Sequence, residues 1–196
     1  MKNKQKGFII PFLLVIIALI VIGGGVYIYN KNSVETPDKS SKTYTNTQYK
    51  FSFNYPSVFT ISNQNIGQEG LVLLRDSSKT FPNTDLHNQI LVSAFSAKGA
   101  TSFADYLTKY PIVDANSNRP LNFVQRTLGS NIFYYAQTER FEGTLSYSYY
   151  LLKGDTIFDF TSISHGVAWT DPNLDVENDS THSFLKGLLT SLRFTH

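Results

Sequence analysis

The feature that most constrains this chain is a long uncharged stretch near its N-terminus. Residues 8–29 read FIIPFLLVIIALIVIGGGVYIY and contain no acidic or basic side chain. As an α-helix this segment is about 33 Å long, which is enough to cross the hydrocarbon core of a bilayer. Pro11 falls in its first turn, where the missing backbone N–H costs little. We therefore predict a transmembrane helix over residues 8–29, which places the lipid bilayer among the chain's partners.

The charges beside this stretch predict its orientation. Lys2, Lys4 and Lys6 precede it, whereas only Lys31 follows closely. Because basic residues concentrate on the cytoplasmic side of membrane helices, we expect residues 1–7 in the cytoplasm and the rest of the chain outside. The net charge of +2 therefore combines a basic leader with a mildly acidic remainder. This distribution argues against a nucleic-acid-binding surface.

Two alternatives to a permanent anchor follow from the same segment. Small residues at Gly23 and Gly25 are arranged as in a signal-peptidase site, although the apolar run is long for a cleaved signal. The Lys6-Gly7-Phe8 sequence resembles the start of type IV prepilins, which are cut after the glycine. That family usually carries a glutamate five positions after the cut, where this chain has Phe12.

Composition defines the parts of the chain that follow the apolar segment. Residues 30–43, NKNSVETPDKSSKT, are polar and mixed in charge, so we predict a flexible linker. We predict one folded domain over residues 44–196, because an aromatic content of 14% supports a packed core. The absence of cysteine excludes disulfides, thiolate metal sites, a cysteine nucleophile and a lipoprotein anchor.

Residue patterns in this domain predict an α+β fold. Alternating or apolar runs rich in aromatic residues predict strands over 49–55, 59–61, 71–75, 90–97, 121–128, 132–139, 145–152 and 156–163. Short glycine-containing turns separate the last four strands, so they form an antiparallel meander.

Two helices are predicted beside these strands. Ser102 and Asp105 form a capping box for a helix that ends at Pro111. Asp179 or Ser180 begins the second helix, whose apolar stripe consists of Phe184, Leu185, Leu188, Leu189 and Leu192. We expect both helices to cover an antiparallel sheet.

Two segments at the ends of the domain carry a family resemblance. They are Tyr44-Thr-Asn46 with Lys50-Phe-Ser-Phe-Asn-Tyr-Pro-Ser57 at its opening, and residues 184–194, FLKGLLTSLRF, at its close. These segments resemble the entry and the closing helix of PsbP-like domains. The resemblance implies an α-β-α sandwich with a central antiparallel sheet. The name-giving members are extrinsic photosystem subunits, and many bacterial relatives are anchored proteins of unknown role. No photosystem-binding residues match, so the resemblance does not extend to that role.

Candidate metal and catalytic residues are sparse. The chain has no G-x-S-x-G, H-E-x-x-H, Walker A or G-x-G-x-x-G motif in the domain. Residues 171–179, DPNLDVEND, offer oxygen ligands for calcium, but Val176 and His182 occupy positions where an EF-hand needs glycine and glutamate. An acidic loop before a helix N-terminus explains the same residues. We predict no metal, cofactor or catalytic site.

We predict structural roles, rather than metal-binding or ligand-binding roles, for the histidines and tyrosines. His87, His165, His182 and His196 lack the i, i+4 spacing of a helical zinc site, so we expect surface or loop-anchoring roles. The aromatic residues of two neighbouring predicted strands could either pack across the strands or form an exposed platform that stacks sugars or bases. They are Phe133, Tyr134, Tyr135, Tyr147, Tyr149 and Tyr150. Packing is favoured, because aromatic residues are common in strands and Tyr150 faces away from Tyr147 and Tyr149.

These observations predict a single-pass membrane protein that displays a non-enzymatic binding or assembly module outside the cytoplasm. A protein partner at the membrane surface is expected. A pilin-like structural subunit, processed after Gly7, is the first alternative. A cell-surface hydrolase is the second, although the sequence contains no recognisable nucleophile and base.

Overall fold

The computed structural model describes residues 40–62, 69–78, 86–114 and 117–195. The predicted basic leader, the transmembrane helix over residues 8–29 and residues 30–39 of the predicted linker lie outside these ranges. Within them, no helix is both long and apolar enough to span a bilayer.

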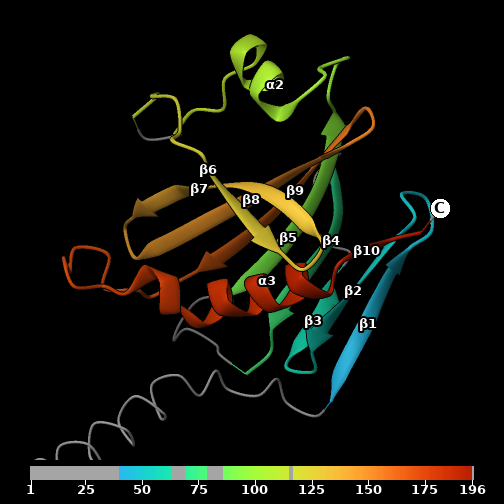
Figure 1. Cartoon of the computed structure of the whole chain (residues 1–196). Coiled ribbons are helices and arrows are strands. Elements are labelled where there is room, and N and C mark those ends of the chain that lie inside the picture. The colour runs from blue at the N-terminus through green and yellow to red at the C-terminus, as the bar shows by residue number, and fades with distance from the viewer. Residues whose placement is uncertain (1–39, 63–68, 79–85, 115–116, 196) are drawn as a thin grey trace, which may run out of the picture. The chain divides into compact units, whose positions relative to one another are not determined.

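A seven-stranded antiparallel sheet forms the centre of the described domain (Figure 1). Its spatial order is β3-β4-β5-β9-β8-β7-β6. The strands are β3 (Phe59–Ser62), β4 (Gly70–Asp76), β5 (Gln89–Ser96), β6 (Val124–Leu128), β7 (Asn131–Phe141), β8 (Thr144–Lys153) and β9 (Thr156–Ser164). The predicted meander is confirmed, because β6, β7 and β8 each pair antiparallel with the next strand in sequence.

A second, three-stranded sheet consists of β1 (Ser41–Asn46), β2 (Phe51–Pro56) and β10 (Arg193–Phe194) in the order β1-β2-β10. The residue pattern predicts one central sheet and a flexible segment up to residue 43. Instead, β1 begins at Ser41, which pairs with Pro56. Backbone pairing with β2 explains the difference, since polar residues such as Lys42 and Thr43 form a ladder without contributing apolar burial.

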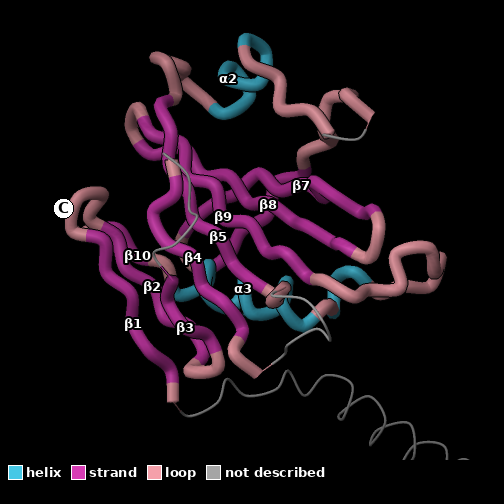
Figure 2. The backbone as a smooth tube through the Cα atoms, turned by 180° about the vertical axis from the view of Figure 1, so that it is seen from behind, coloured by secondary structure: helices cyan, strands magenta, loops and turns pink. Residues whose placement is uncertain are grey.

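Two helices accompany the sheets, α2 (Phe103–Lys109) and α3 (Ser180–Ser191), and both were predicted. Ser102 caps α2 by accepting the backbone N–H of Asp105 at 3.0 Å, as the capping box indicated. Asp179 caps α3 by accepting the backbone N–H of His182 at 3.0 Å. Figure 2 shows the two helices in different parts of the domain.

Two cores lie on opposite faces of the seven-stranded sheet. We call them the α3-side core, which includes Phe51, Phe53, Phe133, Tyr149, Phe160, Leu185 and Leu189, and the α2-side core, which includes Phe103, Tyr106, Tyr150 and Ile157. Tyr149 and Tyr150 are neighbours on β8 and therefore project to opposite faces. The small sheet packs into the α3-side core, so α3 and β2 cover the same face.

Candidate functional site

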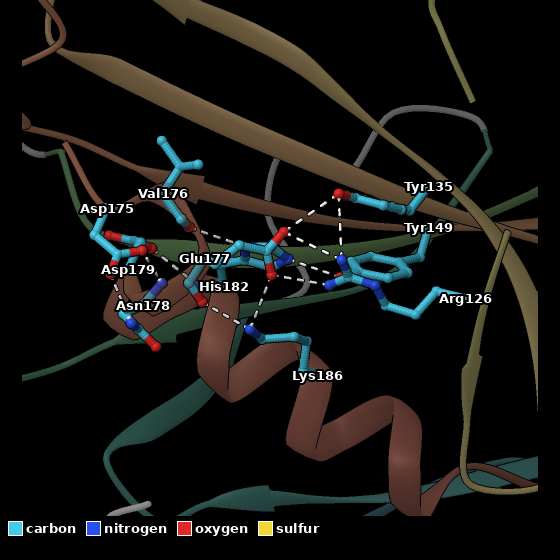
Figure 3. Close-up of polar contacts among 10 residues, drawn as sticks. All are labelled: Arg126, Tyr135, Tyr149, Asp175, Val176, Glu177, Asn178, Asp179, His182 and Lys186. Carbon is cyan, nitrogen blue, oxygen red and sulfur yellow. Dashed lines mark hydrogen bonds and ion pairs between the residues drawn. The ribbon is translucent and has the colours of Figure 1, made fainter. Parts of the chain in front are cut away.

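The densest polar cluster in the described domain lies where β6, β7 and β8 meet the start of α3 (Figure 3). A 3₁₀ turn, η1 (Val176–Asn178), immediately precedes the helix and contributes Glu177. The sheet contributes Arg126, Tyr135 and Tyr149, and α3 contributes His182 and Lys186. We take this cluster as the candidate functional site and call it the η1 cluster.

Arg126 and Glu177 form its charged part. The Arg126 guanidinium donates from Nη1 to Oε2 at 2.9 Å and from Nη2 to Oε1 at 3.2 Å, a two-point contact. The guanidinium also lies 4.3 Å from the centre of the Tyr135 ring, whose hydroxyl donates to Glu177 at 3.2 Å. Lys186 donates to the backbone carbonyl of Glu177 at 2.7 Å.

These contacts favour the ionised form of Glu177. Hydrogen bonding from Arg126 is the main cause that lowers the pKa of the Glu177 carboxyl to about 2. The Glu177 side chain is 43% exposed, so solvent screens the pair and limits its contribution to stability to about 1 kcal/mol. The contact therefore positions η1 more than it stabilises the fold.

His182 forms the buried part of the cluster. Its side chain is fully buried and stacks on the Tyr147 ring with centroids 4.3 Å apart. The ring contacts the carbonyl oxygen of Val176 through Nδ1 at 3.2 Å and the Tyr149 hydroxyl through Nε2 at 2.8 Å. Because a carbonyl only accepts, Nδ1 carries the proton and Nε2 accepts from Tyr149.

The structure of the cluster tests the roles predicted for the histidines and tyrosines. His182 anchors the segment before α3, as expected for a loop-anchoring histidine, but it does so from inside the core, which was not predicted. Its spacing from Leu185 and Leu189 on the same helix face was a signal for that burial. Cross-strand packing is confirmed for Tyr147, Tyr149 and Tyr150, which are all buried.

The carboxylates of the acidic loop before α3 point to separate partners. Asp175 accepts from the side chain of Asn178 at 2.7 Å, and Asp179 accepts from the Ser164 hydroxyl at 2.6 Å. Glu177 is held by Arg126. Across the described ranges, no three His, Asp or Glu side chains are arranged to hold a metal ion. The contacts make Asp175 and Asp179 capping residues and Glu177 an ion-pair partner.

A second polar group lies on the opposite face of the sheet. Asp159 of β9 is half-buried and accepts from the Thr161 hydroxyl at 2.9 Å, and Thr161 contacts Ser148 of β8 at 2.6 Å. Burial among the strands and Tyr150 raises the pKa of the Asp159 carboxyl to about 7, despite hydrogen bonds that oppose the shift. The strand alternation did not single out this residue, since its unusual protonation depends on neighbours from β8.

Asp159→Asn is expected to remove an acid-dependent gain in stability. The native carboxyl titrates near pH 7 and the unfolded one near 3.8, so the native state binds more protons between these values. The contribution of Asp159 to wild-type stability therefore increases as pH falls from about 8 towards 4, and Asp159→Asn removes this contribution. Urea unfolding at several pH values measures the difference between the two proteins. A difference that stays constant across this range would contradict the assignment.

A shallow hollow lies beside β3 and β4. Its volume is about 540 Å³, and its lining includes Thr60, Arg75, Asp76 and His87. Asp76 already accepts two hydrogen bonds from Ser78, from the backbone N–H and from the hydroxyl. The hollow is open and polar, and we regard it as secondary to the η1 cluster.

Comparison with solved structures identifies the fold. The solution structure of cyanobacterial PsbP (CyanoP) from Synechocystis sp. PCC 6803 matches with a TM-score of 0.52 and 12% identity, over 82% of this chain and 96% of that one. A crystal structure from Bacteroides thetaiotaomicron VPI-5482 matches with a TM-score of 0.51 and 15% identity, over 79% of this chain and 48% of that one. The chain thus spans about half the length of the Bacteroides protein.

Sequence comparison adds nothing to this result, because no family model and no curated protein matches. The structural matches show that the chain has a PsbP-like α+β fold with antiparallel sheets and two described helices. The resemblance at both ends of the domain is therefore confirmed at the level of a PsbP-like α+β fold with antiparallel sheets.

Proposed function

We propose that this protein is a single-pass membrane protein that holds a PsbP-like binding or assembly module outside the cytoplasm and has no catalytic activity of its own. The observation that carries the proposal is the pairing of an uncharged segment over residues 8–29, preceded by three lysines, with a PsbP-like domain. The segment provides the anchor, and the lysines set its orientation.

The chemistry of the domain supports a binding role. In the η1 cluster, Arg126 and Glu177 are paired with each other, and His182 contacts the Tyr149 hydroxyl and the Val176 carbonyl. Such a network fixes the shape of a surface, which suits recognition of a protein partner at the membrane. A reacting centre would instead need a nucleophile and a base directed at a common point.

Membrane topology tests the proposal directly. The 196-residue chain with a C-terminal tag is expected in the membrane fraction after carbonate washing, with its domain cleaved by protease added outside intact spheroplasts. A matched variant with Leu13→Asp and Ile17→Asp interrupts the apolar segment and should leave the membrane. A wild-type chain found soluble in the cytoplasm would refute the anchor.

The mass of the mature chain separates the alternatives. An uncleaved anchor keeps Met1 or begins at Lys2. A pilin-like subunit begins at Phe8, after cleavage at Gly7, and a cleaved signal peptide gives a start near Val26. A start at Phe8 together with recovery in filaments would replace the binding-module proposal with the pilin-like one.

A further inference from the structure

We propose that the contact between Tyr149 and His182 is an acid-sensitive latch, which holds η1 and the first turn of α3 against the sheet and opens when His182 is protonated. One ring joins three elements. It lies in the first turn of α3, contacts η1 at the Val176 carbonyl and contacts β8 at the Tyr149 hydroxyl (Figure 3). A change in the charge of this ring therefore acts on all three at once.

The hydrogen bonds around His182 suit only the neutral ring. Nε2 accepts a hydrogen bond from the Tyr149 hydroxyl. The oxygen of the same hydroxyl accepts a hydrogen bond from Nη1 of Arg126 at 3.4 Å. A proton on Nε2 would turn this nitrogen into a second donor toward the Tyr149 oxygen. The hydroxyl hydrogen of Tyr149 would then lose its acceptor, and an unpaired polar group inside the core is costly.

The charges that face His182 divide into two sets. Glu177 of η1 and the capping residue Asp179 favour protonation, whereas Lys186 opposes it. The positive end of the α3 dipole and Arg126 of β6, which reaches the Tyr149 hydroxyl, also oppose it. The other titratable groups of β7 and β8 near the site are Tyr135, Arg140, Tyr147 and Tyr149. Burial raises the pKa of each of the three tyrosines, so these three side chains stay neutral.

Together, burial and the surrounding charges favour the neutral form of His182. Burial is the largest cause that lowers the pKa of His182 below its ordinary value of 6.5. An open state in which this ring meets water titrates near 6.5. Below that pH the open state binds one more proton than the closed state, so each further pH unit favours opening about tenfold until the closed state also titrates.

Opening has a defined structural consequence. The Val176 carbonyl is tied to the ring, whereas Glu177 stays paired with Arg126, so release of His182 frees the Val176 end of η1 and the first turn of α3 from β8. The Tyr147 ring, which is buried beneath His182, then becomes accessible. Mild acid would thus expose an aromatic surface that the closed state covers.

Local hydrogen exchange tests the latch in the whole chain. We expect the backbone amides of residues 176–186, measured in detergent micelles and corrected for intrinsic exchange rates, to lose protection by up to roughly 25-fold between pH 7 and pH 5. His182→Gln cannot be protonated and should abolish this change. His165→Gln is the matched control, because burial also lowers the pKa of His165 but this residue lies outside the latch.

A second variant keeps the test decisive if His182→Gln folds poorly. Tyr149→Phe keeps the ring but removes the donor to Nε2, so neutral His182 loses a favourable contact and the opening midpoint should move to higher pH. Global unfolding is unsuitable here, because protonation of Asp159 has the opposite sign in this pH range. Protection that is independent of pH in wild type, a response retained in His182→Gln, or an unshifted midpoint in Tyr149→Phe would overturn the proposal.

Discussion

Gly129→Ala is expected to lower the free energy of unfolding by about 3 kcal/mol, although it adds only one methyl group. Gly129 lies in the turn between β6 and β7 with φ of +59°, a conformation that L side chains rarely adopt. A Cβ at this position would also collide with the backbone carbonyl oxygen of Thr190 in α3. Backbone cannot rotate away as a side chain does, so the hairpin or the helix must shift.

Gly154→Ala separates the two causes. Gly154 lies in the turn between β8 and β9 with φ of +58°, and no atom lies within 4 Å of the position its Cβ would take. It therefore carries the backbone strain without the collision and should cost about 1 kcal/mol. Chemical denaturation of both variants measures the difference. Equal losses would mean that the close approach of the turn to α3 does not constrain the fold.

The elements that the sequence predicted well are those determined by neighbours in the chain. The β6–β9 meander follows from alternation and short turns, and the start of α2 follows from Ser102 and Asp105. Both signals act within a few residues. The strand β1 was missed, because its residues are mostly polar and its stability comes from pairing with β2 rather than from its own pattern.

The candidate site could not be predicted in the same way. Arg126 and Glu177 are 51 residues apart, and nothing in either local sequence indicates the partner. The near-neutral pKa of Asp159 depends on burial by residues of neighbouring strands. Such contacts appear only when the sheet brings distant segments together. The burial of His182 is the exception that the sequence could have indicated. Its helical spacing from Leu185 places it on the apolar face of α3.

Phe103→Ala is expected to have the other large effect, a loss of about 3 to 5 kcal/mol in the stability of the α2-side core. The Phe103 side chain is buried and stacks with Tyr150 at 5.3 Å, and it meets Phe123 edge-on at 5.4 Å. The helix α2 has only seven residues, so it is too short to persist without this packing. Removal of the ring should therefore undock and unfold α2.

The two cores make this a local event, and hydrogen exchange by residue can detect it. In Phe103→Ala, amides of α2 should lose protection while those around Leu185 and Leu189 keep most of theirs, since these leucines belong to the α3-side core. Phe133→Ala is the matched control, because Phe133 is equally buried but lies in the α3-side core, so its loss should weaken protection throughout the domain. A uniform loss in Phe103→Ala would instead show that the sheet couples its two faces into one cooperative unit, because Tyr149 and Tyr150 share the backbone of β8.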